Sequence, residues 1–214
     1  MSNDYSANET SATEYRALQA KVDAFCEATA TRRQADLSCR KGCDGCCHVW
    51  LSVSPVEAEA VRTALTALPA AQRAEIAERG RREGAREADG RGSPRCAMLS
   101  DDGQCAVYAQ RPLVCRTQGH ALRYPPGFVP AGAVRARTSG AASSSAGEIT
   151  YCPLNYTEQA PGAADVLDAE RVDQLLAIVN HRFALARGVS AEQRTSISEL
   201  AQGADMLGCP ESRG

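Results

Sequence analysis

The segment that decides how this chain folds is Cys39-Arg40-Lys41-Gly42-Cys43-Asp44-Gly45-Cys46-Cys47. Four cysteines and two glycines within nine residues are incompatible with a regular helix or strand, so we expect an irregular loop here. Thiolates are soft ligands that favour zinc, copper(I) and iron–sulfur centres over magnesium or calcium. Gly42 and Gly45 stand where a loop needs tight turns that point backbone N–H groups at sulfur. The segment therefore predicts a metal-wrapping loop.

Four further cysteines lie later in the chain and complete a set of eight expected ligands. Eight thiolates suffice for two tetrahedral zinc sites, for two cuboidal clusters, or for one cluster with spare thiols. Adjacent side chains of an extended segment point apart. We therefore expect Cys46 and Cys47 to serve different centres, or one of them to be a free thiol beside a ligand. The candidate metal ligands are Cys39, Cys43, Cys46, Cys47, Cys96, Cys105, Cys115 and Cys152.

The spacing of the cysteines favours iron–sulfur over zinc. Zinc sites of four cysteines usually consist of two separate knuckles with two residues between ligands. Here the first two gaps hold three and two residues, and Cys152-Pro153 resembles the distant cysteine–proline pair of bacterial ferredoxins. We predict a 4Fe–4S cluster, with structural zinc as the alternative. Radical-SAM enzymes share the three-and-two spacing, but Gly45 occupies their usual aromatic position and the chain lacks their strand–helix alternation.

Composition and charge exclude several classes of function. Aromatic residues make up only 5% of the 214 residues, so Ala, Leu and Val, or a bound metal, must stabilise the fold. A net charge of -2 provides no basic field for nucleic acid. No apolar run approaches the roughly 20 residues that span a bilayer, and residues 1–13 lack the apolar segment of a secretory signal. We expect a cytoplasmic protein, in which reducing conditions disfavour disulfides.

Helical patterns occupy most of the remaining chain. The spacing of apolar residues predicts a helix from Thr13 to about Ala35. Ser54-Pro55 followed by Glu57 is a helix start, because serine caps, proline fits the first position and acid suits the first turn. This helix should end near Leu68, and a charged second helix should follow over residues 70–88. Residues 165–186 carry a long apolar stripe that Gly188 terminates.

The other segments complete the expected organisation. Short strands should flank the turn at residues 101–103, residues 107–116 should form an interrupted helix, and residues 191–202 a last helix. Residues 124–147 should form a long loop, with strand-like alternation only at residues 134–137. The fold class is therefore mainly α: a small helical domain around an irregular cysteine-rich core with little β. The expected boundaries are a disordered tail 1–12, one domain 13–203 with its metal core at 39–152 and C-terminal helices at 165–203, and a tail 204–214.

Three motifs together resemble the CxxCxxCC (YkgJ-type) cysteine-cluster family, whose members are described as putative zinc- or iron-chelating proteins. They are the segment at 39–47, then Cys96-Ala-Met-Leu with Asp102-Gly-Gln-Cys105-Ala-Val-Tyr108, and Arg111-Pro-Leu-Val-Cys115-Arg116. The first gap is one residue longer than the family's name implies. One branch resembles flagellin lysine N-methylases, which carry an iron–sulfur cluster and use S-adenosylmethionine. A SAM-dependent, methylase-like enzyme is thus a further alternative, although no glycine-rich methyl-donor motif is visible.

Two arginines beside the cysteines are candidate cofactor-binding residues. Arg111 and Arg116 flank Cys115, and a guanidinium donates hydrogen bonds to thiolate or sulfide while offsetting negative charge. The alternative is that both pair with surface carboxylates. The other potential ligands are three histidines and two cysteines. A structural role is favoured for His48, His120 could reach a metal or a substrate, and His181 should be an ordinary helix residue. Cys26 and Cys209 are not expected to bind metal.

The sequence leaves two classes of function open. In the first, the metal is structural or redox-active and the protein is a binding or electron-transfer module. In the second, an open iron acts on a small molecule or a protein side chain, and the protein is an enzyme. An open iron has fewer than four protein ligands, so the number of cysteines per metal discriminates the two. No residue stands out as catalytic, and the partner is expected to be an unidentified protein or small molecule.

Overall fold

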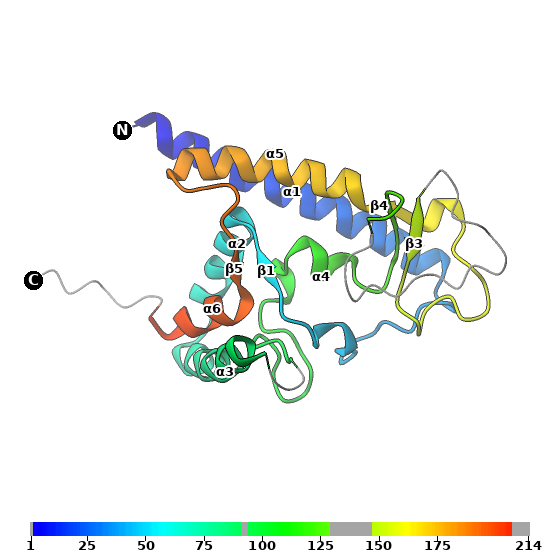
Figure 1. Cartoon of the computed structure of the whole chain (residues 1–214), viewed down its shortest axis with the longest axis horizontal. Helices are drawn as coiled ribbons and strands as arrows, with labels where there is room; N and C mark the ends of the chain where they lie inside the picture. The colour runs from blue at the N-terminus through cyan, green and yellow to red at the C-terminus, as the bar shows by residue number, and fades with distance from the viewer. Residues whose placement is uncertain (1, 91–93, 129–146, 207–214) are drawn as a thin grey trace, which may run out of the picture. The chain divides into compact units, whose positions relative to one another are not determined.

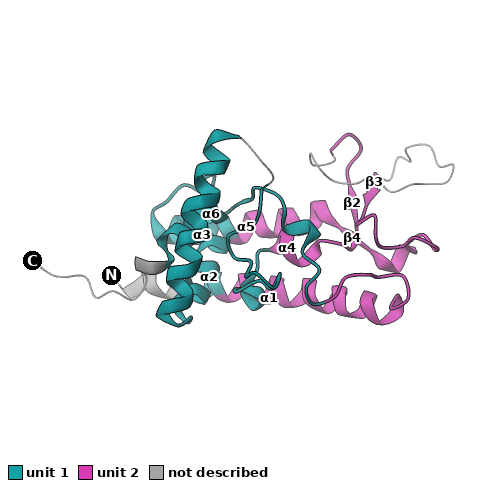
Figure 2. Cartoon of the chain, turned by 90° about the horizontal axis from the view of Figure 1, so that it is seen from below, with its two compact units in different colours: residues 1–12, 41–112, 180–214 teal, residues 13–40, 113–179 magenta. Residues whose placement is uncertain are grey.

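The computed structural model describes residues 2–90, 94–128 and 147–206, and the chain folds into two compact units (Figure 2). Unit 1 consists of Met1–Ala12, Lys41–Pro112 and Asn180–Gly214, and unit 2 of Thr13–Arg40 and Leu113–Val179. Helices dominate the described residues and the strands are short (Figure 1). The expected mainly α fold with little β is therefore confirmed. The domain boundaries proposed from the sequence stay a prediction.

Two long helices contribute residues to both units. Helix α1 (Ser2–Arg32) includes the helix expected from Thr13 but begins earlier, in residues expected to be a disordered tail. Ser11 is buried, so the helix is already packed before the expected start. Helix α5 (Ala169–Arg187) ends before Gly188, which has a φ of +65°, as its terminating role predicted.

The two central helices of unit 1 follow their local signals. Helix α2 (Pro55–Thr66) starts after Ser54 as expected, and the backbone N–H and hydroxyl of Ser54 donate to the Glu57 carboxylate at 3.1 and 2.8 Å in a capping box. Helix α3 (Ala70–Asp89) confirms the second, charged helix. These elements form as predicted because each starts and stops through contacts between residues near one another in the chain.

The C-terminal part of unit 1 is less regular than expected. Helix α6 covers only Ile197–Gln202, because the preceding residues form strand β5 (Thr195–Ser196), which pairs antiparallel with β1 (Ser52–Val53). Helix α6 packs closely on α3: a Cβ added at Gly80 would lie 2.5 Å from the backbone nitrogen of Gln202. The tertiary pairing of β5 thus replaces the first turns of the expected helix.

The core of unit 1 is aliphatic, as the scarcity of aromatic residues predicted. Two of the candidate ligands, Cys96 and Cys105, are partly buried against it, so the expected metal region borders the core directly. The buried cluster of described residues consists of Val53, Ala58, Val61, Leu65, Ile76, Ala77, Ala97, Met98, Val107, Ile197, Leu200, Ala201 and Ala204.

Unit 2 contains a three-stranded sheet in the order β3-β2-β4. Strand β2 (Ala121–Tyr124) pairs antiparallel with β3 (Glu148–Thr150) and parallel with β4 (Val166–Asp168). Strand β4 occupies residues that the sequence assigned to the start of the last long helix. The apolar residues 166–167 suit either a helix or a strand. Parallel pairing with β2, about 45 residues earlier in the chain, makes them a strand. The alternation expected at residues 134–137 lies outside the described residues.

A buried carboxylate connects α1 to the turn before β4 within unit 2. The side chain of Asp165 is 4% exposed and accepts hydrogen bonds from Arg33 Nε at 2.7 Å, Arg32 Nε at 3.3 Å and the Gly162 N–H at 3.0 Å. Burial acts to raise the pKa of Asp165, but these hydrogen bonds outweigh it and the pKa is lowered.

Helix α4 (Leu113–Thr117) also belongs to this unit. No helix of the described ranges has an apolar stretch long enough to cross a membrane.

Candidate metal centre

The first cysteine loop of unit 1 is irregular, as expected. Gly42 has a φ of +83°, which only glycine adopts without strain, and a single 3-10 turn covers Gly45–Cys47. Within that turn Cys46 and Cys47 are neighbours, and the Cys47 thiol acts to raise the pKa of Cys46. The structure therefore differs from the extended arrangement expected for the pair, because a 3-10 turn rotates successive side chains by about 120° rather than 180°. The expectation that the two cysteines serve different centres, or that one is a free thiol, stays a prediction.

The second cysteine region of unit 1 forms a small hairpin. Leu99 and Cys105 make an isolated antiparallel bridge in place of the two short strands expected around the turn at residues 101–103. The Ala106 N–H donates to the Met98 carbonyl at 2.9 Å and extends the pairing. The Cys96 N–H donates to the Cys47 carbonyl at 2.9 Å, so the hairpin is fixed to the first cysteine loop.

The thiols of unit 1 influence one another's ionisation. The hydrogen bond with Cys47, followed by burial, raises the pKa of Cys46. Burial, together with negative charge on Cys105 and Cys46, raises the pKa of Cys96 to about 11. Burial likewise raises the pKa of Cys105. Cys46, Cys96 and Cys105 thus lie within range of one another's charge, in surroundings that favour the neutral thiol unless a cation is present.

Arg111 supplies positive charge to this group of thiols. Its positive charge acts to lower the pKa values of Cys46 and Cys105, but other causes, burial among them, are larger and the net pKa of each thiol is raised. Its guanidinium lies 4.0 Å from the centre of the Tyr108 ring, and Tyr108 itself is 61% exposed. This stacking fixes the guanidinium near the thiols. The cofactor-binding role expected for Arg111 stays a prediction.

Unit 2 carries the other three candidate ligands of the described chain. Cys39 is exposed, whereas Cys115 in α4 and Cys152 after β3 are half-buried. The carbonyl of Cys152 accepts a hydrogen bond from the Asn155 N–H at 2.9 Å, which closes a turn after the cysteine–proline pair.

Asn155 is a residue that the sequence did not single out. Its side-chain amide nitrogen donates to Cys39 Sγ at 3.4 Å and to the Gly119 carbonyl at 2.7 Å. Its oxygen accepts from the Ser38 N–H at 2.8 Å. No spacing rule for ligands would have identified an asparagine 116 residues from its cysteine.

Arg116 has a different environment from Arg111. It is buried and forms an ion pair with Asp23 of α1, also in unit 2. Its carbonyl accepts a hydrogen bond from the Cys26 thiol at 3.7 Å. The carboxylate alternative considered for the two arginines therefore describes Arg116, and Cys26 is a packed thiol as expected.

The histidines and the last cysteine add little to the candidate centre. His48 Nδ1 lies 3.2 Å from the Pro94 carbonyl and its Nε2 lies 3.5 Å from Asp44, which suits the favoured structural role. The His120 N–H closes the turn after α4 onto the Thr117 carbonyl at 3.1 Å. His181 is exposed on α5. Cys209 lies outside the described residues.

The donor chemistry fits a soft metal, although the side chains are not arranged around one point. Within ranges 2–90, 94–128 and 147–206, no three His, Cys, Asp or Glu side chains form a group that would hold one ion. All nine cysteines of these ranges are free thiols. Sulfur donors beside an aliphatic core, with a guanidinium nearby, suit zinc or an iron–sulfur cluster and not a hard cation. Metal binding would replace the thiol protons, since thiolates are the ligand form.

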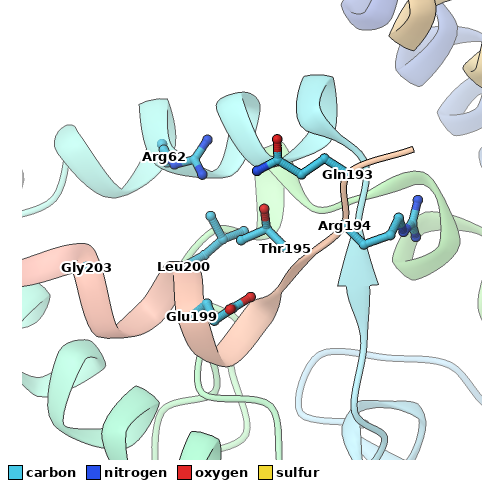
Figure 3. A pocket seen from close by; sticks show the side chains of 7 residues that line it. All are labelled: Arg62, Gln193, Arg194, Thr195, Glu199, Leu200 and Gly203. Atoms are coloured by element: carbon cyan, nitrogen blue, oxygen red, sulfur yellow. The ribbon is translucent and has the colours of Figure 1, made fainter. Parts of the chain in front are cut away.

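The pocket drawn in Figure 3 offers no competing site. It has a volume of about 350 Å³, and its charged side chains already support local structure. Arg194 donates to the Ser52 carbonyl at 2.6 Å, and Glu199 accepts from the Ser196 N–H at 2.6 Å in the capping box of α6. The pocket is lined by Arg62, Gln193, Arg194, Thr195, Glu199, Leu200 and Gly203, none of which is a soft metal ligand.

Comparison with known proteins agrees with the resemblance seen in the motifs. The family model CxxCxxCC, described as "Putative zinc- or iron-chelating domain", matches residues 38–141. The matched part includes Cys39 through Cys115, whereas Cys152 and Asn155 lie beyond its end. No curated protein and no solved structure matches the chain.

Proposed function

We propose that this chain is a metal-binding protein whose cysteines hold an iron–sulfur cluster of the 4Fe–4S type, since the CxxCxxCC family model matches residues 38–141. The family match supports metal binding in general and covers zinc and iron alike. The choice of iron–sulfur rests on the three-and-two spacing of Cys39, Cys43 and Cys46 and on Cys152-Pro153.

The observation that carries the proposal is the hydrogen bond from the Cys96 N–H to the Cys47 carbonyl at 2.9 Å, which joins the two cysteine-bearing segments of unit 1. Burial raises the pKa values of both Cys96 and Cys105, so these thiols lie in surroundings that disfavour an uncompensated thiolate. Several neighbouring thiolates are unfavourable beside an aliphatic core unless a cation compensates them. Bound iron would supply that compensation, and the group would then contribute to folding as well as to function.

Arg111 supports a cluster in particular. Hydrogen bonds and positive charge near the sulfurs are among the properties that set the reduction potential of an iron–sulfur cluster. A guanidinium fixed by stacking on Tyr108 is suited to that role. Partial burial of Cys96 and Cys105 would also limit the access of water.

Zinc is the second candidate because the description of the family model names zinc as well as iron. Unit 1 contains the thiols of Cys46, Cys47, Cys96 and Cys105, and four thiolates are the donor set of a closed structural zinc site. A zinc centre of this kind would make the protein a binding module without catalysis. The methylase-like alternative rests on the family resemblance alone.

Metal analysis of protein purified without oxygen tests the proposal. We expect a brown protein with a broad visible absorption and about four irons and four sulfides per cluster. A colourless protein with zinc and no sulfide would refute the cluster and support the structural module. Fewer than four cysteines bound per cluster would indicate an open iron and an enzyme, whereas four would indicate a binding or electron-transfer role.

A further inference from the structure

Asn155 is held more rigidly than a surface asparagine requires. The residue is 1% exposed, and both polar atoms of its side chain form hydrogen bonds. The oxygen accepts the Ser38 N–H, and the nitrogen donates one hydrogen bond to the Gly119 carbonyl. Its backbone N–H also donates to Cys152. The orientation of the amide is therefore fixed by three chain segments of unit 2.

The second donor of this fixed amide points at the sulfur of Cys39. The distance from Asn155 Nδ2 to Cys39 Sγ is 3.4 Å, a normal length for an N–H···S hydrogen bond. A thiolate is a much better acceptor than a neutral thiol, because it carries the full negative charge. Cys39 is exposed, so water would satisfy it if it were an ordinary surface thiol. A buried donor directed at it indicates that this sulfur has to be oriented.

The absence of a side chain at Gly119 leaves room for the contact between Asn155 Nδ2 and Cys39 Sγ. A Cβ added at this residue would lie 2.6 Å from Cys39 Sγ and 3.2 Å from Asn155 Nδ2. Its φ of +91° is also unfavourable for any other residue. Both the backbone conformation and the available volume at position 119 thus suit the sulfur–amide contact.

We propose that Asn155 is a positioning residue that orients Cys39 as a metal-binding thiolate. The inference rests on the proposed function, since it assumes that the chain binds a metal through its cysteines. Partners that hydrogen-bond to metal ligands fix the ligand's orientation, and their loss typically lowers metal affinity by about 10- to 100-fold. Asn155 therefore extends the candidate centre beyond the matched family region and secures the role of Cys39 despite the longer first gap.

Another buried asparagine provides a matched control. Asn180 in unit 1 is 5% exposed, its oxygen accepts the Val56 N–H at 3.2 Å, and its nitrogen donates to the Ala191 carbonyl at 2.9 Å. It bridges two backbone segments as Asn155 does, but neither of these two hydrogen bonds involves sulfur. If Asn155 has only a structural role, Asn155→Ala should behave like Asn180→Ala: the melting temperature should fall and the protection of Cys39 should not change.

The test measures alkylation of each cysteine in the full-length protein, with metal and after chelation, by mass spectrometry. In the wild type we expect metal to slow the alkylation of Cys39 in unit 2 and, separately, of Cys46, Cys96 and Cys105 in unit 1. In Asn155→Ala, Cys39 should react at least about tenfold faster in the metal-loaded protein, while the other three stay protected. Asn180→Ala should lower the melting temperature and leave the protection of Cys39 unchanged.

The outcomes separate this inference from the proposed function. If metal protects no cysteine of the wild type, both are refuted. If Cys46, Cys96 and Cys105 are protected but Cys39 is not, or if Asn155→Ala retains wild-type protection of Cys39, only the role of Asn155 is refuted. Should Asn155→Ala fail to fold, NMR of the cadmium-loaded wild type decides. A scalar coupling between the isotope-labelled Asn155 amide proton and cadmium supports the hydrogen bond to a metal-bound sulfur, and its absence overturns it.

Discussion

The backbone N–H of Cys96 donates a 2.9 Å hydrogen bond to the carbonyl of Cys47, and this contact joins the two cysteine-bearing segments of unit 1. It links residues 49 positions apart, between loops that contain little regular structure. Because the Cys96 side chain also packs on the aliphatic core, the contact couples the candidate centre to the stability of the unit. Changes at the cysteines should therefore affect metal content and folding together.

Loss of a ligand should remove metal and destabilise the protein. Cys43→Ser and Cys115→Ser are each expected to lower the metal content and the soluble yield, because the metal contributes to folding. Cys209→Ser should affect neither, since this residue is not among the candidate ligands. Elemental analysis and soluble yield measure the three variants side by side. Full metal content in both ligand variants would contradict the assignment.

Arg111 should support metal retention through its charge and its position. Arg111→Leu removes the guanidinium that acts on Cys46 and Cys105, and we expect metal affinity to fall by about tenfold in a chelator competition. Arg62→Leu is the control, because Arg62 is partly exposed and forms only a long contact of 3.9 Å with Glu59. Equal affinities of the two variants would exclude a role for Arg111 at the centre.

Gly80 should be required for the packing of α6 on α3. In Gly80→Ala the new Cβ would approach the Gln202 nitrogen to 2.5 Å and the Ala201 Cβ to 2.8 Å, so the helices must separate. Overpacking costs about 1–3 kcal/mol, which exceeds the gain of roughly 0.5–1 kcal/mol from replacing glycine in a helix. Thermal unfolding should show a net loss. Gly203→Ala meets no atom within 4 Å and should change stability by less than about 0.5 kcal/mol.

Asp165 should stabilise the fold at neutral pH and not in acid. Its pKa is lower in the folded state than the ordinary value of 3.8, so its contribution is present above that pH and is lost as the pH falls through the folded value. Asp165→Asn should cost about 1–3 kcal/mol at pH 7, toward the lower end because Arg32 is half-exposed. Urea unfolding should show the difference from wild type shrinking below pH 3.8. A difference that is independent of pH would contradict the ionic role.

Several elements of the fold were predictable because their signals are local. The capping box of Ser54 and Glu57 and the stop before Gly188 involve residues within a few positions of each other. The aliphatic character of the core followed from composition. For the candidate centre, the sequence predicted the cysteines and Arg111 from thiol and guanidinium chemistry, which does not depend on the fold, and their roles stay predictions.

Other features depended on contacts between distant segments. Residues 166–168 have apolar character that suits a helix or a strand, and only the parallel pairing with β2 makes them β4. Cys46 and Cys47 lie in a 3-10 turn rather than in the extended segment assumed. Arg116 forms an ion pair with Asp23, 93 residues away, so its position beside Cys115 in the sequence did not reveal that Asp23 is its partner.

By itself, the sequence determined that this protein is mainly helical and rich in soft metal ligands, since helix signals and donor chemistry are properties of short segments. Only the tertiary structure decided which thiols approach one another, which arginine stays near them, and that Asn155 faces Cys39 across 116 residues. The physical reason is that such contacts form when chain segments close on each other during folding, and closure over long separations leaves no pattern in local spacing.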